Sequence, residues 1–513
     1  MKILLCSFEE GVRGISIRYL SSYLKENGFS VGLLFLDRAA SLKGYPAFLE
    51  KEVCAVAQFI AKNEVEYIGL SLMTENFYEA KSFIREIKKR CGKVKFISGG
   101  IHATLCPQEC IGIGSDLAVI ASGERPLKRI LSAEGYERIT GICYQDNRGV
   151  LRLNHPDDQD LPDLSNLPFP DYSFNNEYIL GPSGEIKVMN SMIFRRRTTW
   201  GGRYYPLLTS RGCIYNCAYC CNYNRLKVKR NSVGHVMEEL LYVKNKLPFT
   251  EGLNIQDDSF YMGSDDYLVE FSKMVRSRLG WPLIARMMSK YVTEERVRIL
   301  KNGGLEFVSI GLQASDRINK ELYDRPETAE AFIGACRILS DNGIKYVVDV
   351  IIDNPYETDD DLREVVETLN SIPKPFMVNA FSLTVFPRTR LWERVQRDGM
   401  ADKFLTDAFN KRLLTYSFNS KFYQDKILRN PPGKYVTPLA WRKLIAGVAG
   451  LSSKQAIVGI LENGVTSKNI QKKIDFIYFR NKLIFQAANG IKERNILLFR
   501  LLEKFFCFFW RII

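Results

Sequence analysis

Three cysteines lie close together near the middle of the chain. Cys213, Cys217 and Cys220 form a C-x3-C-x2-C pattern directly after the strand-like segment PLLTSRG. Three thiolates on one tight loop can hold three irons of a cubane iron–sulfur cluster and leave the fourth iron open. A structural zinc site normally takes four ligands in pairs of the C-x2-C type, and no second pair lies nearby. We therefore predict a catalytic iron–sulfur site; the alternative is a loop of reduced, partly buried cysteines.

The cysteine loop, with aromatic Tyr219 just before the third cysteine, resembles the radical S-adenosylmethionine superfamily. In that family the open iron binds the amino and carboxylate groups of S-adenosyl-L-methionine (SAM), whose reductive cleavage releases a 5′-deoxyadenosyl radical. The resemblance implies that Cys213, Cys217 and Cys220 ligate a 4Fe-4S cluster and that Tyr219 lies near the adenine. Cys221 adjoins the third ligand, and we interpret it as a bystander.

Segments downstream of the cysteines extend this resemblance over about residues 205–395. The segment NIQDDSF resembles the strand end that meets the methionine amino group, and SIGLQAS resembles a later segment that contacts ribose and carboxylate. VIIDNPYET and TVFPRTRL resemble the last strand-end motifs of the family's barrel. The resemblance implies SAM contacts from these residues: Gln256, Asp257, Asp258, Gln313 and Arg325.

The first 180 residues or so resemble the cobalamin-binding domain that precedes one large branch of radical SAM enzymes. The resemblance rests on the loops YIGLSLMT, SGGIHATLCP and ASGERP and on the Pro-rich segment that ends in LPFPDY. Glycines in a strand-end loop let a flat corrin approach the backbone, and hydroxyls can bond its amides and phosphate. The expected cobalamin contacts are Ser71, Thr74, Gly99, Gly100, His102, Ser122 and Gly123.

The loop after the first predicted strand reads SFEEGVRG and contains no histidine. Cobalamin domains of the methionine synthase type carry a cobalt-ligating histidine in a D-x-H-x-x-G loop at this point. We therefore expect cobalamin without a histidine ligand from this loop. We expect His102 to pack in its own loop, or to contact the corrin or its nucleotide tail, rather than to ligate cobalt. We interpret the other N-terminal cysteines, which are scattered, as small buried residues.

Strand-like and helix-like segments alternate in two stretches of the chain. In residues 1–145 this pattern predicts a parallel, doubly wound Rossmann-like sheet, whose ligands bind at the carboxyl ends of the strands. Residues 146–204, which include a stretch rich in Pro and Asp over 157–171, are expected to form an extended linker. In residues 205–400 six βα-type units predict a partial, TIM-like α/β barrel with its chemistry on the loops after the strands. The fold class is thus α/β, with a mainly helical segment over 401–513.

The net charge of +14 belongs almost entirely to the C-terminal segment. Residues 401–513 contain 20 Lys and Arg against 7 Asp and Glu, a balance of +13. The last twenty or so residues (RNILLFRLLEKFFCFFWRII) are nearly apolar all round. This pattern predicts an interfacial helix on a membrane or a lid over an apolar substrate; the alternative is a terminal helix buried against the barrel or a partner chain. A nucleic-acid site is not expected, since no stacking platform accompanies the basic residues.

The start of the chain lacks the pattern of a secretory signal, and no apolar stretch approaches the roughly 18 residues of a spanning helix. We expect a cytoplasmic protein, with peripheral contact to the inner face of the membrane as an option. Twelve cysteines in such a protein favour metal ligands and core residues over disulfides.

The resemblance implies a 4Fe-4S cluster, SAM and cobalamin as cofactors, and a small-molecule or lipid-like substrate. It also implies a low-potential electron donor such as flavodoxin or ferredoxin. The predicted function is a cobalamin-dependent radical SAM enzyme, a methyltransferase acting on an unactivated carbon. One alternative is a radical cyclase or oxidative rearrangement enzyme of the same branch. Another, from a different class, is a corrinoid-binding or redox-sensing protein without catalysis.

Overall fold

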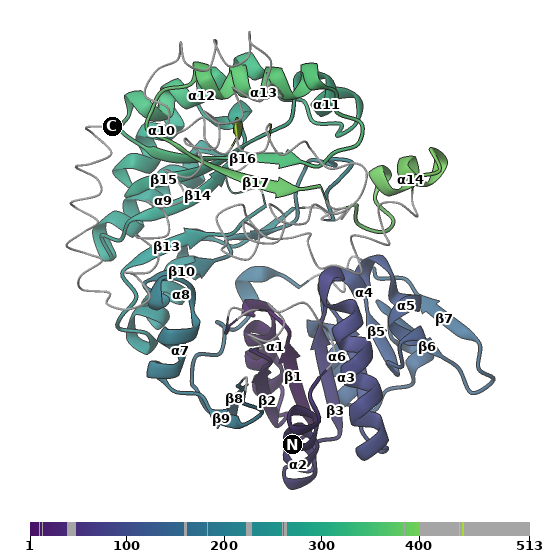
Figure 1. Cartoon of the computed structure of the whole chain (residues 1–513). Helices are drawn as coiled ribbons and strands as arrows, with labels where there is room; N and C mark the ends of the chain where they lie inside the picture. Colours follow the sequence, from purple (N-terminus) through teal and green to yellow (C-terminus); the bar gives the residue numbers. More distant parts are fainter. Residues whose placement is uncertain are drawn as a thin grey trace. The chain divides into compact units, whose positions relative to one another are not determined.

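The computed structural model describes residues 1–9, 11–12, 14–37, 48–157, 162–181, 183–221, 228–258, 260, 264–383, 385–400, 441 and 444–445. The chain divides into two compact units. The first unit comprises residues 1–214, 220–258 and 386–393, and the second comprises residues 215–219, 259–385 and 394–513. Each unit is described by itself below, with the element labels of Figure 1.

A nine-stranded sheet in the order β7-β6-β5-β4-β3-β1-β2-β8-β9 forms the centre of the first unit. The central strands β5, β4, β3, β1, β2 and β8 run parallel to one another. Strands β6, β7 and β9, at the two edges, are antiparallel to their neighbours. The sheet consists of β1 (Ile3–Ser7), β2 (Val31–Phe35), β3 (Tyr67–Ser71), β4 (Lys95–Gly99), β5 (Leu117–Val119), β6 (Ile142–Gln145), β7 (Leu151–Asn154), β8 (Glu177–Leu180) and β9 (Ile186–Val188). Strands β1 and β2 are buried at every position, as their unbroken apolar runs predict.

Helices connect the parallel strands (Figure 1). Helix α1 packs against α6, and α2 packs against α3, as in a doubly wound sheet. The helices of this part are α1 (Ile15–Glu26), α2 (Glu50–Lys62), α3 (Phe77–Arg90), α4 (Ile101–Leu105), α5 (Pro107–Gly112) and α6 (Glu124–Leu131). Because β2 and β3 lie on opposite sides of β1, the chain changes direction between β1 and β3, and this change marks the expected ligand crevice.

Residues 146–204, which the sequence suggested as an extended linker, add regular structure to the first unit. Strand β7 extends one edge of the sheet, and the β8–β9 hairpin extends the other through pairing of β8 with β2. Helix α7 (Ser191–Arg197) follows. These strands are short, and the pairing of β8 with β2 joins segments far apart in the sequence, so the local pattern does not reveal it.

A fully buried ion pair attaches this hairpin to helix α1. The Arg18 guanidinium donates to Glu177 Oε1 at 2.9 Å and to the Asp171 carbonyl at 2.6 Å. It also lies over the rings of Phe35 and Tyr172. Burial raises the pKa of Glu177, while the facing Arg18 opposes the rise. Charges so far from water need this pairing, because an unpaired buried ion is strongly destabilising.

The strand–helix alternation resumes after residue 203. In the first unit, β10 (Tyr204–Leu207) pairs in parallel with β13 (Gly252–Ile255), and α8 (Val233–Lys246) connects them. Strand β10 overlaps the start of the strand-like segment PLLTSRG. Between them β11 (Ser210–Arg211) and β12 (Lys229–Arg230) form a short antiparallel pair at the base of the cysteine loop.

Four parallel strands in the order β14-β15-β16-β17 form the sheet of the second unit. They are β14 (Leu283–Met287), β15 (Leu305–Gln313), β16 (Lys345–Ile352) and β17 (Met377–Ser382). The intervening helices are α9 (Asp265–Arg278), α10 (Glu294–Asn302), α11 (Asp316–Glu321), α12 (Ala329–Asp341) and α13 (Asp359–Ser371), and α14 (Arg390–Arg397) follows β17. Each of these strands is an apolar run that ends in a turn signal, as the strand–helix alternation of this stretch predicts.

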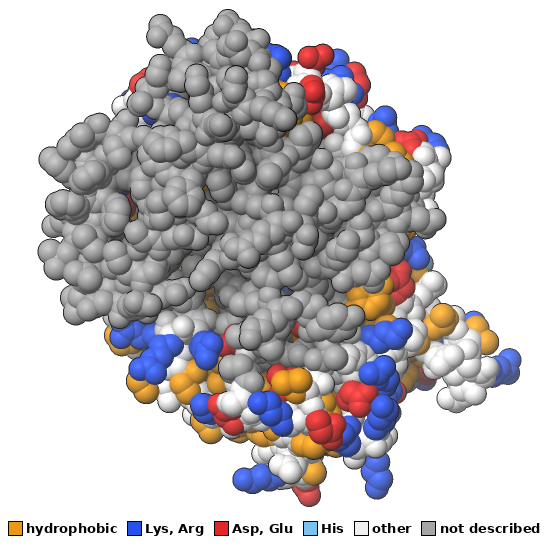
Figure 2. Space-filling model, in the orientation of Figure 1, with side chains coloured by type: hydrophobic (Ala, Val, Ile, Leu, Met, Phe, Trp, Pro, Cys, Tyr) orange, Lys and Arg blue, Asp and Glu red, His pale blue; other side chains and the backbone are white. Residues whose placement is uncertain are grey.

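The C-terminal segment contributes little to the described structure. Of residues 401–513, only Trp441, Leu444 and Ile445 are described, and all three are buried. The prediction of a mainly helical segment, and that of a terminal interfacial helix, therefore lie outside the described residues. On the face in Figure 2, the described surface mixes Lys and Arg with Asp and Glu, in line with the near-neutral balance of the first 400 residues. No helix within the described ranges is both long enough and apolar enough to cross a membrane.

Candidate functional site

A cavity of about 360 Å³ lies in the first unit at the carboxyl ends of the parallel strands. Apolar side chains from both the strands and the flanking helices form most of its wall, among them Leu5, Leu70, Ile97 and Val119 from the strands and Leu20 and Leu127 from the helices. This is the crevice at the change of strand order, where doubly wound sheets bind their ligands. An apolar cavity with a few polar groups suits a flat, largely apolar macrocycle.

Five of the seven predicted cobalamin residues line this cavity: Ser71, Gly99, Gly100, Ser122 and Gly123. They lie at the last positions of β3 and β4 and in the loops after β4 and β5, which the parallel sheet brings to one edge. Thr104, which the sequence analysis missed, adds a further hydroxyl and donates to the Gly100 carbonyl at 2.9 Å. The sequence could have indicated Thr104, because a residue one helical turn after Gly100 lies on the same face of the helix.

Gly100 is required by the backbone rather than by a ligand. Its φ of +90° is one that other residues rarely adopt, and a Cβ there would lie 2.8 Å from the Leu72 carbonyl oxygen. The Leu72 amide in turn donates to the Gly99 carbonyl at 2.9 Å. The glycine pair thus lets the end of β4 turn sharply into α4 against the end of β3.

Thr74 and His102, the other two predicted cobalamin contacts, do not line the cavity. Both are buried, and His102 Nδ1 lies 3.3 Å from Thr74 Oγ1. The Phe77 ring packs on the imidazole, with centroids 4.5 Å apart. Burial lowers the pKa of His102 to about 4, so the ring is neutral at physiological pH. Packing of His102 in its own loop was one of the two predicted roles.

The other wall of the cavity comes from the segments that flank the cysteine loop. Ser210, Arg211 and Gly212 precede the cysteines, while Lys229 and Asp258 follow them. The Arg211 guanidinium donates to Glu124 Oε1 at 2.8 Å, at the start of helix α6. The sheet edge and the base of the cysteine loop therefore enclose one space within the first unit. Sequence reasoning missed this, because nothing in the order of residues relates positions 124 and 211.

Asp257 and Asp258, predicted together as SAM contacts, have different surroundings. Asp257 is buried and accepts from the Thr209 amide at 2.6 Å, the Thr209 hydroxyl at 2.5 Å and the Ser210 hydroxyl at 2.7 Å. Burial raises its pKa, and these bonds oppose the rise. Asp257 therefore fixes the strand that leads into the cysteine loop, whereas the exposed Asp258 lines the cavity. Gln256, at the end of β13, is half-buried.

The predicted cluster ligands occupy the loop that β11 and β12 close. Cys217 is buried, and Cys213 and Cys220 are partly exposed. In a cubane each thiolate binds a different iron, so the three sulfurs need not converge on one point as they would around a single ion. In the second unit, Cys217 hydrogen-bonds with the guanidinium of Arg325. A neighbouring cation favours the thiolate, which is the form of cysteine that binds metal.

Tyr219 and Arg325, both predicted SAM contacts, share their surroundings in the second unit. The Tyr219 ring meets the Tyr323 ring edge to face, with centroids 4.7 Å apart, and the Tyr323 carbonyl accepts from the Ala218 amide at 2.8 Å. Arg325 forms a buried ion pair with Glu327. Burial by itself would lower the pKa of Arg325, but Tyr219, Glu327 and Cys217 raise it above its ordinary value. Arg325 therefore stays charged, and it is a buried cation beside Tyr219 and Cys217.

Gln313 lies at the end of β15 with a φ of +66°. A Cβ added to Gly311 would lie 2.3 Å from Gln313 Nε2 and 3.2 Å from the Arg325 guanidinium. Gly311 therefore leaves room for both predicted side chains to approach its backbone, and its carbonyl accepts from Arg325 at 3.2 Å. The strained backbone of Gln313 at a strand end is the kind of feature that concentrates at functional sites.

A polar group inside the second unit's sheet was not predicted. Asp349 of β16 accepts from the Ser309 hydroxyl at 2.5 Å and from the Asn379 amide at 3.0 Å, across three neighbouring strands. Burial raises the pKa of Asp349. The signal available in the sequence was one acidic residue within the apolar run YVVDVII. Such a residue in a strand interior must find buried partners.

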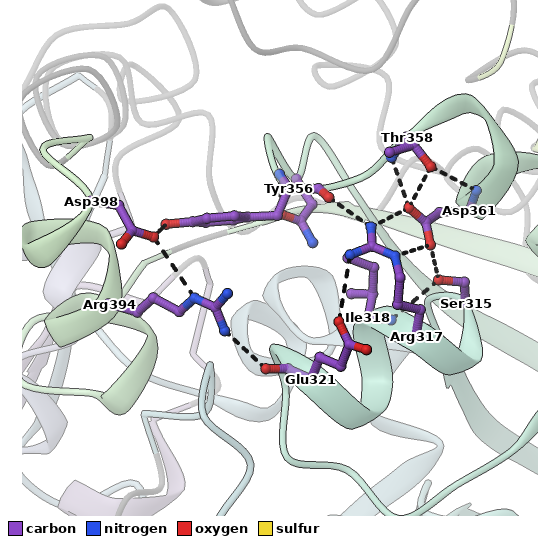
Figure 3. A network of polar contacts seen from close by, with 10 residues as sticks. Ser315, Arg317, Ile318, Glu321, Tyr356, Thr358, Asp361, Arg394 and Asp398 are labelled. Carbon is purple, nitrogen blue, oxygen red and sulfur yellow. Dashed lines mark hydrogen bonds and ion pairs between the residues drawn. The ribbon is translucent and has the colours of Figure 1, made fainter.

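A network of charged groups holds the loop after β16 (Figure 3). Arg317 donates to Asp361 at 2.5 Å and to the Tyr356 carbonyl at 2.9 Å. Asp361 also accepts from Ser315 and completes a capping box with Thr358 at the start of α13. Burial by itself would raise the pKa of Asp361, but its bonds from Arg317, Ser315 and Thr358 hold it well below the ordinary value. The VIIDNPYET motif is therefore positioned from two helices.

Two family models match the chain, in the domain order that the sequence predicts. The model described as B12 binding domain matches residues 1–131, and the model described as Radical SAM superfamily matches residues 207–369. The chain belongs to the radical SAM superfamily, in the branch that carries a B12-binding domain. The predicted family is confirmed. So is the predicted fold class, a doubly wound domain followed by a partial α/β barrel.

The relatives of this chain differ in their described activities. An uncharacterized methyltransferase of Pyrococcus horikoshii is 25% identical over 354 residues, which span 66% of this chain and 71% of the relative. The anaerobic magnesium-protoporphyrin IX monomethyl ester cyclase of Rubrivivax gelatinosus is 20% identical over 74% of this chain and 65% of its own. The solved radical SAM methyltransferase TsrM of Kitasatospora setae, with cobalamin and a [4Fe-4S] cluster bound, has a TM-score of 0.62 at 17% identity over 77% and 78% of the two chains.

The residues present fit the cofactors of this family. Three cysteines supply the thiolates that a site-open cubane needs. The apolar cavity with hydroxyls at its rim suits cobalamin, and no histidine is among the described residues that line it. The predicted cofactors of this radical SAM enzyme are therefore a 4Fe-4S cluster, SAM and cobalamin, as expected from the sequence.

Proposed function

We propose that this enzyme is a cobalamin-dependent radical SAM methyltransferase that methylates an unactivated carbon of a small molecule. The observation that carries the proposal is one cavity that is lined both by the carboxyl ends of β3, β4 and β5 with the loops after β4 and β5, and by the residues that flank the cysteine loop. When bound there, SAM on the cluster supplies a hydrogen-abstracting radical, and cobalamin supplies the methyl group. Both cofactors must reach the same substrate carbon, so hydrogen abstraction and methyl transfer require one shared space.

Residues of the chain support this proposal by positioning and by excluding water. Asp257 fixes the strand before the cysteines, and the ion pair of Arg211 with Glu124 connects that strand to the first sheet. The apolar walls of the cavity help to exclude water from it. We propose SAM-facing roles for Tyr219, Gln313 and Arg325 in the second unit.

A test that needs no substrate separates the candidate functions. The anaerobically reconstituted full chain is incubated with cobalamin, a low-potential reductant and SAM that carries a deuterated methyl group. Mass spectrometry then measures 5′-deoxyadenosine and deuterated methylcobalamin against a protein-free sample. The methyltransferase proposal predicts both products above the protein-free level. 5′-Deoxyadenosine without label on cobalamin would instead favour the cyclase or rearrangement alternative, and neither product would favour a corrinoid-binding or sensing protein.

The cluster ligands are tested with a matched control. Changing Cys213, Cys217 and Cys220 together to Ala should abolish 5′-deoxyadenosine formation and remove about four irons per chain, as one cubane requires. Cys221→Ala, one residue away and in the same loop, should keep both. Full iron loading in the triple variant would show that the cluster lies elsewhere.

We also propose a flavodoxin- or ferredoxin-like electron donor and a cytoplasmic location, with peripheral membrane contact through the last twenty or so residues. Basic residues near an anionic surface contribute about 1 kcal/mol each, and exposed charges are screened over about 10 Å at 0.1 M salt. The full chain should then sediment with anionic liposomes at low salt and much less with neutral ones. A chain ending at Glu493 should lose this binding and keep its iron. Loss of both solubility and iron would instead place the segment in the core.

A further inference from the structure

A group of three metal-ligating side chains lies beside the cobalamin cavity and outside the site described so far. His102, Cys106 and Glu109 offer ligand atoms that all lie within 4.8 Å of one another. Within the described residues this is the one such group of three. The residues follow one another along α4 and the start of α5. We propose that these three side chains form a zinc-binding site.

The imidazole of His102 is oriented as a metal ligand would be. Its Nδ1 faces the Thr74 hydroxyl at 3.3 Å, and the Phe77 ring fixes the ring plane. Its Nε2 is buried and has no hydrogen-bond partner. Metal-bound histidines regularly use their second ring nitrogen in this way, because that bond fixes the tautomer and leaves the other nitrogen free to ligate. An unsatisfied buried nitrogen calls for a partner, and a cation at Nε2 would be one.

The distances need little change to accommodate zinc. His102 Nε2 lies 3.7 Å from Glu109 Oε2. Around a tetrahedral zinc, with bonds of about 2.0 to 2.3 Å, neighbouring ligand atoms lie about 3.3 to 3.6 Å apart. Small rotations of the Cys106 and Glu109 side chains would therefore close the site. Imidazole, thiolate and carboxylate are the ligand types that zinc takes, and three protein ligands leave a fourth position for water.

The charges of the site balance with a divalent ion. Cys106 as a thiolate and Glu109 as a carboxylate carry two negative charges, and the neutral His102 adds none. In this structure the Cys106 thiol hydrogen-bonds with Glu109 and with Arg388. Arg388 is exposed, so its side chain can turn to solvent when a metal takes its place. The Glu109 side chain, 54% exposed, gives the ion a route of entry.

The site would brace the helix that carries part of the cavity wall. Ile101 and Thr104 of α4 line the cavity, whereas His102 and Cys106 do not. Zinc between α4 and α5 would therefore fix the turn that presents Gly100 and Thr104 to cobalamin. The expected role is structural, and the site does not depend on the methyltransferase proposal.

The test uses the full chain with its iron–sulfur cluster already reconstituted, so that iron occupies the cluster cysteines. After removal of unbound metal, the protein is dialysed against zinc sulfate, and zinc and iron are counted in the same sample. We expect about one zinc per chain, with one sulfur among its ligands by zinc-edge X-ray absorption. The iron count reports separately on the cluster and on folding.

Two variants with matched controls decide the assignment. Glu109→Gln should weaken zinc binding at least tenfold. Loss of a residue that only hydrogen-bonds to a metal ligand already lowers metal affinity about 10- to 100-fold, and Glu109 would be a ligand itself. Cys106→Ser should remove the sulfur ligand and the retained zinc. Glu137→Gln and Cys91→Ser, which alter the same residue types away from the site, should bind zinc like the unaltered protein. If the unaltered protein retains no zinc, or if both site variants retain it with iron loading intact, the proposal is wrong.

Discussion

A buried carboxyl next to the cavity of the first unit should make the stability of this enzyme depend on pH. Glu239 of α8 is fully buried, and it accepts hydrogen bonds from Tyr19 at 2.9 Å and from Tyr205 at 2.5 Å. Tyr19 lines the cavity, and Tyr205 lies on β10. Burial raises the pKa of Glu239 to about 7, although the two phenols and Arg211 oppose the rise. This carboxyl thus connects three elements of the first unit.

The expected magnitude follows from linkage. The ordinary pKa is 4.5, so between pH 4.5 and about 7 the unfolded chain loses this proton while the folded chain keeps it. Stability therefore falls as pH rises through that range. Each tenfold difference in proton affinity corresponds to about 1.4 kcal/mol, so the full effect is about 3 kcal/mol. The contribution is complete below pH 4.5 and lost above about 7.

The assay compares three proteins by urea denaturation between about pH 5 and about pH 8, where this proton is exchanged. Glu239→Gln keeps the shape and the acceptor oxygen but cannot ionise, so its free energy of unfolding should fall less with pH than that of the unaltered protein. Glu238→Gln, the exposed neighbour on the same helix, should leave the pH profile unchanged. Equal pH slopes for the unaltered protein and Glu239→Gln would refute the reasoning, because no other change distinguishes them.

Three further predictions follow from other contacts. Arg18→Met should cost about 3 to 5 kcal/mol of unfolding free energy, because it leaves Glu177 buried and unpaired, and adding Glu177→Gln should recover much of the loss in the same denaturation assay. Asp361→Asn should cost about 1.5 to 3 kcal/mol by weakening the bonds from Arg317, and since the pKa of Asp361 is lowered, the difference from the unaltered protein should shrink as pH falls below 3.8. Bound cobalamin should lack a histidine ligand from the loop after β1, so the electron paramagnetic resonance spectrum of its Co(II) form should show no nitrogen splitting; a split spectrum would identify a nitrogen ligand after all.

The sequence determined the order of the two domains and most of their strands. A strand and its following loop are local features, because an apolar run that ends in Gly, Ser or Asp marks both. The cysteine spacing is local as well, since one tight loop carries all three thiolates. Five of the seven predicted cobalamin residues proved to line one cavity for the same reason: parallel strands place their carboxyl ends at one edge.

Only the tertiary structure decided which neighbouring polar residues face a cavity and which hold the protein together. Asp257 and Asp258 are adjacent and chemically alike, but one is buried among hydroxyls and the other lines the cavity. Likewise Thr74 and His102 lie in the predicted loops and pair with each other away from the cavity. Side-chain direction depends on packing between segments far apart in the sequence, as does the pairing of β8 with β2 that made part of the expected linker a sheet edge. The types and spacing of neighbouring residues do not indicate which distant segments will pack against them.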